Sequence, residues 1–313
     1  MYTRRTFIKS AIAASALPAT ACRTKPLSSN NPVPRQICVF SKHLQFLDYE
    51  IMAQTAAEIG FDGVDLTVRP GGHVLPENVT RDLPRAVKAV ERAGLKVPMM
   101  TTRITSAGEA HTEEILKTAS DSGITHYRMG YWSYDHSLSI MDNLNQYRVE
   151  MQKLSALNKK YGIRGAYQNH SGKRVGGPVW DLWHLLKDLD PERIGCQYDV
   201  RHATIEGGYS WPLGMRLLSD YIRDTVIKDC IWIEKEGEWH HHSVPLGEGM
   251  VDWQRYFNLI KEKNIFGPIS MHFEYPLYDK NTDPSPEQRK AQTVQNMQKD
   301  LKWLRKELKK VDL

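Results

Sequence analysis

The stretch GVDLTVR, residues 63–69, alternates apolar and polar side chains along a short extended segment. Val64, Leu66 and Val68 form one row, and the residues between them form a polar row on the opposite side. The stretch PISMHFE, residues 268–274, repeats this alternation near the other end of the chain. Strands with one apolar face toward surrounding helices and one polar face toward a closed interior are required by a (βα)8 barrel.

Further apolar runs occur between these two strands and alternate with helical patterns. The eight runs are ICVF (37–40), GVDLTV (63–68), LKVPMMTT (95–102), ITHYRM (124–129), IRGAYQ (163–168), IGCQYD (194–199), YIRDTVIK (221–228) and PISMHFE (268–274). Between them, apolar residues recur at spacings of three and four, as in the segments 140–161 and 294–308. We therefore predict an α/β protein whose residues 36–313 form a single (βα)8 TIM barrel.

The segment before the barrel has the features of an export signal. Residues 3–9, TRRTFIK, precede a small apolar run, which is typical of a twin-arginine signal peptide over residues 1–22. The uncharged stretch 10–22 is shorter than the roughly 20 residues of a membrane-spanning helix. Cys22 is alternatively a lipid attachment site, and residues 23–35 resemble a flexible linker. We expect a periplasmic protein, free or lipid-anchored, without a transmembrane helix in its mature chain.

The charge balance changes once this leader is set aside. Six of the 42 Lys and Arg residues lie within residues 1–35, which contain no acid, so 36 basic residues face 37 acidic ones in the remainder. A surface that binds nucleic acid needs clustered positive charge. A nearly neutral domain therefore argues against a nucleic-acid partner and against nuclease activity.

Polar residues gather where the predicted strands end, which is where TIM barrels carry their catalytic groups. The candidates for substrate binding are Arg69, His73, Arg128, Asn169, His170, Arg201 and His272. By their alternation, Asp199 and Glu274 also point into the barrel, where an unpaired carboxylate is costly. The required cation is either a divalent metal ion or Lys228 together with the arginines.

These strand ends resemble the xylose isomerase-like sugar phosphate isomerase/epimerase family, which includes relatives of endonuclease IV. The resemblance spans residues 37–308 and rests on GFDGVDL (60–66), Asn169-His170, Asp199-x-x-His202, Lys228-Asp229, Gly247-Glu248-Gly249 and Glu274. It implies a divalent ion held by a Glu of strand five, an Asp of strand six, a His of strand seven and a Glu of strand eight. It also implies that the two glutamates act as acid and base beside a sugar carbonyl.

Two of the four implied metal ligands match this chain, namely Asp199 and Glu274. The strand-five position is Gln168 and the strand-seven position is Val226. Two alternatives follow: a reshaped site in which Asp199, Glu274 and Gln168 hold manganese, magnesium or zinc, or a site in which Lys228 supplies the positive charge.

The loss of the strand-five glutamate also limits the chemistry. An amide cannot shuttle a proton, so Gln168 cannot serve as the second base of a two-base epimerisation. Glu274 is the candidate base, and Lys228 and His202 complete the candidate catalytic group. We expect isomerisation or elimination by proton abstraction beside the carbonyl of a keto-sugar or glycoside. The alternative is a non-catalytic protein that binds a small carbohydrate.

The segment between Asp229 and Glu248 contains three adjacent histidines, 240–242. Adjacent histidines cannot all face one metal ion, so we predict an exposed loop here. Trp232 and Trp239 in the same segment have two interpretations, either stacking on sugar rings or packing in the core.

Overall fold

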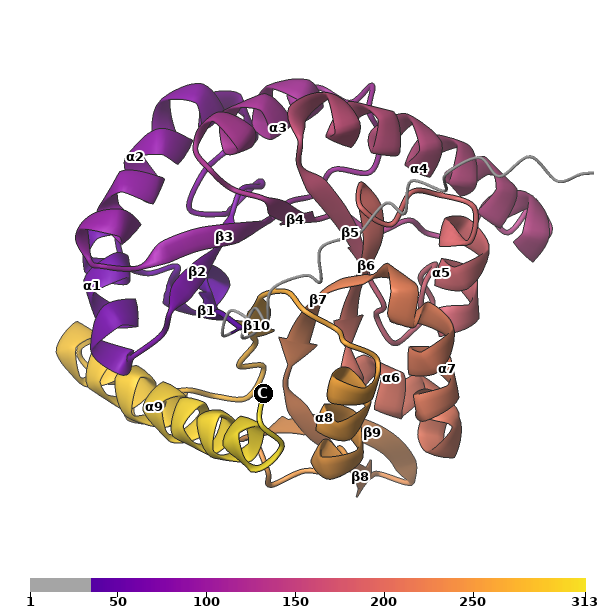
Figure 1. Ribbon diagram of the computed structural model, residues 1–313. Coiled ribbons are helices and arrows are strands. Elements are labelled where there is room, and N and C mark those ends of the chain that lie inside the picture. The colour runs from indigo at the N-terminus through magenta and orange to yellow at the C-terminus, as the bar shows by residue number, and fades with distance from the viewer. Residues whose placement is uncertain (1–34) are drawn as a thin grey trace, which may run out of the picture. The chain divides into compact units, whose positions relative to one another are not determined.

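Eight parallel strands close into a barrel, which confirms the predicted fold (Figure 1). The computed structural model describes residues 35–313, so the predicted signal peptide and residues 23–34 of the linker lie outside the described residues. Arg35, the last residue of that linker, donates hydrogen bonds to the Gly267 carbonyl at 2.9 Å and the Thr225 hydroxyl at 2.8 Å. This end of the linker is thus fixed to the barrel.

The strand order around the barrel is β1-β10-β7-β6-β5-β4-β3-β2. The barrel strands are β1 (Ile37–Phe40), β2 (Gly63–Thr67), β3 (Lys96–Thr101), β4 (His126–Arg128), β5 (Arg164–Gln168), β6 (Ile194–Asp199), β7 (Ile222–Ile227) and β10 (Ile269–Met271). All eight predicted runs contain one of these strands, in the predicted order.

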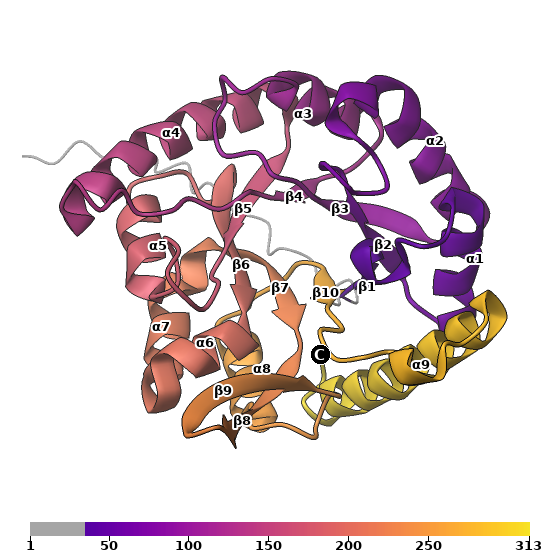
Figure 2. The ribbon, with the colours of Figure 1, turned by 180° about the vertical axis from the view of Figure 1, so that it is seen from behind.

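Helices surround the barrel on its outside, as both views show (Figures 1 and 2). They are α1 (Tyr49–Ile59), α2 (Val79–Arg92), α3 (Thr112–Asp121), α4 (Ile140–Tyr161), α5 (Val179–Leu186), α6 (Val200–Gly207), α7 (Trp211–Leu218), α8 (Trp253–Glu262) and α9 (Pro286–Lys310). None of the helices between residues 35 and 313 combines the length and apolar character needed to span a bilayer.

Local sequence explains where the long helices begin and end. Ser139 caps α4 by accepting a hydrogen bond from the Asp142 amide, and Gly162 ends the helix with φ of 65°. Ser285 and Gln288 form a reciprocal capping box at the start of α9. The apolar residues at positions 294, 297, 301, 304 and 308 of α9 are all buried, as their spacing predicts.

The interior of the barrel is polar, which confirms the alternation in residues 63–69. Asp65 is fully buried and accepts hydrogen bonds from Thr101 at 2.9 Å and from Ser270 at 2.7 Å. Val64 and Leu66, on the opposite row, belong to the apolar core outside the barrel. The strands therefore bury both of their faces, one against helices and one against each other.

The segment after β7 forms a hairpin, so the prediction of a loop there is wrong. Strands β8 (Asp229–Lys235) and β9 (Glu238–Val244) pair antiparallel around Glu236 and Gly237, whose φ values are 57° and 84°. The three histidines lie on β9 and are exposed, as expected. The side chains of Trp232 and Trp239 are exposed rather than packed in the core.

Candidate active site

A cavity of about 160 Å³ opens at the carboxyl ends of the barrel strands. We call it the central cavity. Its lining is formed by Phe40, Lys42, Arg69, Arg128, Tyr131, Gln168, His170, Lys228, His272 and Glu274. Seven of these ten residues are among the site residues that the sequence predicts. The structure therefore brings most of the predicted group together.

Lys228 lies at the buried end of this cavity and joins two other predicted residues. Its Nζ lies 3.0 Å from Asp199 Oδ2 and 2.8 Å from His202 Nε2, and all three side chains are buried. Burial lowers the pKa of Lys228, although the charges of Asp199 and Glu274 oppose this shift. The result is a buried ammonium group held by a carboxylate and an imidazole.

His202 is neutral in this arrangement. Burial and the Lys228 charge lower its pKa well below the usual value. Nε2 accepts from the Lys228 ammonium, and Nδ1 lies 2.7 Å from the Ser171 hydroxyl and 3.4 Å from Nη1 of Arg201. His202 thus orients Lys228 without adding charge.

Both carboxylate oxygens of Asp199 are engaged. Oδ1 accepts from the His202 amide at 3.1 Å and caps α6, while Oδ2 faces Lys228 and accepts from Gln168 Nε2 at 2.7 Å. The Gln168 carbonyl oxygen in turn accepts hydrogen bonds from Arg128 at 3.2 Å and from the Tyr131 hydroxyl. Gln168 thus extends the network that begins at Lys228.

As arranged in this structure, Asp199, Glu274 and Gln168 do not form a donor set that fits a divalent ion. The Lys228 ammonium lies against the Asp199 oxygen that a metal ion would use, and Gln168 presents its amide nitrogen there. Val226, at the position implied for a histidine ligand, is apolar and buried. Between residues 35 and 313 no group of three or more His, Cys, Asp or Glu side chains is arranged to hold a metal ion.

Glu274 lies at the rim of the central cavity, beyond the end of β10. Its Oε2 is 3.5 Å from Nζ of the exposed Lys42, and its own side chain is 33% exposed. Burial alone raises the pKa of this carboxyl, but the charges of Lys228 and Lys42 outweigh burial and lower the pKa to about 2. Glu274 is therefore a carboxylate at neutral pH.

An aromatic wall completes the cavity between β1 and β10. The ring of His272 stacks on Phe40 with 4.4 Å between centroids. The Phe273 amide donates to His43 Nε2 at 3.0 Å, and burial lowers the pKa of His43 to about 3. His43 follows β1 in a short 3-10 helix and is not among the residues predicted from the sequence.

Three predicted substrate-binding residues do not line the central cavity. His73 contacts the hydroxyls of Thr67 and Ser41 at 3.2 Å each. Asn169 bridges β5 and β6 by bonding the Asp199 amide at 2.8 Å and the Asp199 carbonyl at 2.9 Å. Arg201 reaches the hairpin, 3.0 Å from His241 Nδ1. In the structure these three side chains contact other residues of the protein and are not part of the cavity lining.

Tyr131 lines the central cavity and is not among the residues predicted from the sequence. It lies three residues after β4, and its ring is 5.2 Å from the guanidinium carbon of Arg128 and 5.0 Å from that of Arg174. A tyrosine in an irregular loop carries no periodic signal, and only its place in the fold brings it to the site. Arg174, which lies in the loop after β5 and contacts Tyr131, likewise has no periodic signal in the sequence.

The fold and this cavity define a class of protein, a (βα)8 barrel with a charged site at the carboxyl ends of its strands. The family model described as xylose isomerase-like TIM barrel matches residues 53–307. The chain therefore belongs to the xylose isomerase-like TIM barrel family. The sequence matches none of the curated proteins.

Solved structures of low sequence identity share the fold. The apo form of the 3-keto-D-glucoside 4-epimerase YcjR from E. coli aligns with a TM-score of 0.64 and 14% identity, covering 87% of this chain and 99% of YcjR. The probable 3-DHS dehydratase AsbF from Bacillus anthracis gives 0.60 and 14%, covering 83% and 97%. A xylose isomerase-like TIM barrel protein from Mycobacterium smegmatis in complex with magnesium gives 0.62 and 13%, covering 86% and 97%.

Proposed function

We propose that the protein abstracts a proton beside the carbonyl group of a keto-sugar or glycoside and so catalyses its isomerisation or an elimination. The observation that carries this proposal is the buried Lys228 ammonium, 3.0 Å from Asp199, in a cavity that also presents the Glu274 carboxylate. A fixed cation and a carboxylate facing one small cavity are the two groups that enolate chemistry requires.

Lys228 supplies the electrophile in this proposal. As a proton leaves the carbon next to a carbonyl group, negative charge develops on the carbonyl oxygen. An ammonium group already held by Asp199 and His202 stabilises that charge without reorganising. Its lowered pKa also favours donation of a proton to the oxygen.

Glu274 supplies the base. It is ionised at neutral pH, but the cations that lower its pKa to about 2 also make it a weak base. The substrate proton must therefore be acidified first, and polarisation of the carbonyl group by Lys228 provides this. A single base on one face suits elimination or isomerisation, and epimerisation needs a proton donor on the opposite face.

The family and the fold neighbours support a carbohydrate substrate. A 3-keto-D-glucoside 4-epimerase has the same fold, and a probable dehydratase does as well. The first name describes epimerisation at the carbon next to a keto group, and the second describes loss of water. Neither name gives the substrate of this chain. The alternative function is that of a protein that binds a carbohydrate without converting it.

The test is hydrogen exchange in heavy water, followed by NMR on a panel of ketoses and 3-keto-glucosides. The wild type is expected to exchange the proton next to the carbonyl group of at least one member. Glu274→Gln is expected to slow exchange about 10²- to 10⁴-fold, and Lys228→Met about 10²- to 10³-fold. Glu262→Gln, a charge-matched change on the outer helix α8, is expected to leave the rate unchanged.

Folding of each variant is checked by circular dichroism and thermal unfolding. An unchanged exchange rate in Glu274→Gln removes that residue as the base. If the wild type exchanges no proton yet binds a panel member in calorimetry, the protein is a carbohydrate-binding protein and the enzymatic proposal is wrong.

A further inference from the structure

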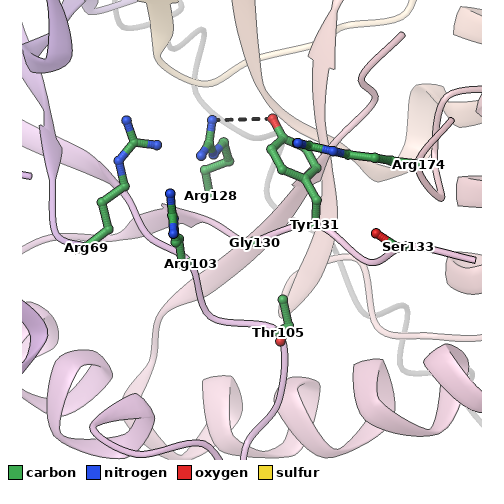
Figure 3. A pocket seen from close by; sticks show the side chains of 8 residues that line it. All are labelled: Arg69, Arg103, Thr105, Arg128, Gly130, Tyr131, Ser133 and Arg174. Atoms are coloured by element: carbon green, nitrogen blue, oxygen red, sulfur yellow. Dashed lines mark hydrogen bonds between the residues drawn. The ribbon is translucent and has the colours of Figure 1, made fainter. Parts of the chain in front are cut away.

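A second cavity, of about 400 Å³, adjoins the central cavity and contains four arginines (Figure 3). They are Arg69, Arg103, Arg128 and Arg174, and we call this space the arginine cavity. Figure 3 shows Arg69, Arg103 and Arg128 grouped together, with the guanidinium group of Arg174 over the Tyr131 ring. Among residues 35–313, no Asp or Glu belongs to the lining of this cavity.

The four arginines come from consecutive parts of the barrel. Arg69 and Arg103 each lie two residues beyond a strand, β2 and β3 respectively, and Arg128 is the last residue of β4. Arg174 lies in the loop after β5. Because parallel strands end at the same face of a barrel, residues far apart in the sequence converge on one cavity.

None of these guanidinium groups forms an ion pair with a carboxylate of residues 35–313. Arg128 is buried, with only 6% of its surface exposed, and its Nε has no hydrogen-bond partner among the described residues. Burial and the nearby charge of Arg128 lower the pKa of Arg69. The charge of the buried Asp65 opposes this shift. Asp65 is not among the residues that line the arginine cavity, so four positive charges face this space without a carboxylate in the described lining, and an anion is the ligand that would balance them.

Aromatic rings pack against three of the four arginines, Arg69, Arg128 and Arg174. Tyr131 lies against both Arg128 and Arg174, and the Arg69 guanidinium carbon lies 5.4 Å from the Phe40 ring. Stacking on a ring fixes the plane of a guanidinium group while leaving its N–H donors free for a ligand. Planar donors of this kind bind carboxylate, sulfate and phosphoryl oxygens in a bidentate manner.

The two cavities share three residues, Arg69, Arg128 and Tyr131. A single ligand can therefore place one part beside Lys228 and another part among the arginines. We propose that the substrate is an anionic carbohydrate whose oxyanion group, a carboxylate, sulfate or phosphoryl group, binds to Arg69, Arg103, Arg128 and Arg174. This inference rests on the proposed function, because it assumes that the central cavity receives a sugar.

Calorimetry on a matched series tests the inference without requiring turnover. The neutral probe is methyl β-D-glucopyranoside. The three charged probes are the corresponding glucopyranosiduronate and the 6-sulfate and 6-phosphate esters of the neutral glucoside. The charged glycosides are expected to bind at least about tenfold more tightly than the neutral one, and this preference is expected to weaken as salt increases. The tightest of the three charged probes identifies the oxyanion.

The double variant Arg103→Gln/Arg174→Gln removes two exposed arginines and leaves the buried Arg128 intact. This variant is expected to lose most of the preference for the charged glycosides over the neutral one. Arg255→Gln, an exposed arginine on α8 outside both cavities, is the matched control and is expected to keep it. Inorganic sulfate, phosphate and acetate are tested by thermal unfolding on the same three proteins.

The outcomes separate the two proposals. Equal binding of neutral and charged glycosides overturns the inference and leaves the carbohydrate function standing. Stabilisation by an inorganic anion that the double variant loses, with no binding of any glycoside, supports the anion site and contradicts the carbohydrate function. Binding of neither glycosides nor inorganic anions overturns the inference.

Discussion

Lys228 contacts Asp199, the carboxylate that the family resemblance implies as a metal ligand. Its ammonium group carries one charge where a divalent ion carries two, and it donates hydrogen bonds instead of accepting lone pairs. Asp199 neutralises that charge, and Gln168 avoids the repulsion that a second carboxylate at strand five would add. The substitutions at positions 168 and 226 are therefore consistent with each other, and together they describe a site built around lysine.

At the residue scale, we predict that the purified protein contains far less than one manganese, magnesium or zinc ion per chain. Asp199→Ala is expected to leave that content unchanged, because Asp199 binds Lys228 and not a metal ion. The same variant is expected to lower the free energy of unfolding by about 3 to 5 kcal/mol, because a buried charge loses its partner. Mass spectrometry measures the metal, and denaturant titration measures the stability.

The control is Asp121→Ala, which breaks the exposed pair between Asp121 and Lys117 and is expected to cost no more than about 1 kcal/mol. A near-stoichiometric ion that disappears in Asp199→Ala would contradict this account of Lys228.

At the element scale, Asp229 organises the connection from β8 and β9 to α8. Its carboxylate accepts hydrogen bonds from the Gly247, Gly249 and Val251 amides at 3.1–3.3 Å and from the Trp253 indole at 2.9 Å. A Cβ atom on Gly249 would lie 2.0 Å from Asp229 Oδ1. In the motif Gly247-Glu248-Gly249, the backbone amides of both glycines thus bind the Asp229 carboxylate, and the lack of a side chain at Gly249 allows this close approach.

We therefore predict that Gly249→Ala lowers the free energy of unfolding by about 2 to 4 kcal/mol, because the new methyl group displaces Asp229 from its donors. Gly108→Ala is the matched control, since the nearest atom to its added Cβ is 3.9 Å away, and it is expected to change stability little. Urea denaturation compares the two variants. Equal stability would mean that the loop relaxes around the methyl group at no cost.

The barrel elements could be predicted from sequence because each strand repeats one physical pattern. An apolar row meets helices and a polar row meets the barrel interior, as in residues 63–69 and 268–274. The β8–β9 hairpin escaped prediction because it lies outside the barrel and much of it is exposed, so no core imposes alternation on it.

The site residues that lie at strand ends could be predicted from the sequence, and those that lie in loops could not. Lys228, His202 and Asp199 lie at or near strand ends, so their positions follow from the barrel. Tyr131 and Arg174 lie in loops, and their meeting depends on contacts between loops that no local pattern encodes. Glu274 was placed correctly near the cavity, but β10 ends at Met271, three residues before it.

At the scale of the whole molecule, buried carboxyls inside the barrel couple folding to pH. Asp224 on β7 is fully buried and lies opposite Gln197 of β6. Burial raises the pKa of Asp224 to about 8. The charge of Asp65 also raises the pKa of Asp224, and the charge of Arg35 lowers it. In the unfolded chain an aspartate has a pKa of about 4, so the folded protein holds a proton that the unfolded chain releases between these values.

The sign of the effect follows from this difference in bound protons. Below pH about 4 both states are protonated, and the contribution of Asp224 to stability is fully present. As the pH rises toward about 8 the unfolded chain is favoured, so this contribution is lost. Histidines with lowered pKa, such as His43 and His126, act in the opposite direction below pH about 6.5, so the wild-type curve alone does not isolate Asp224.

We therefore predict the difference between Asp224→Asn and the wild type. An asparagine cannot ionise, so the variant is expected to gain stability relative to the wild type as the pH rises from about 4 to about 8, with a slope of up to about 1.4 kcal/mol per pH unit. Guanidinium unfolding at several pH values measures this difference. Asp220→Asn, at an exposed aspartate just before β7, is the matched control. A flat difference for Asp224→Asn would mean that Asp224 is ionised in the folded barrel, stabilised by Arg35 and not protonated by burial.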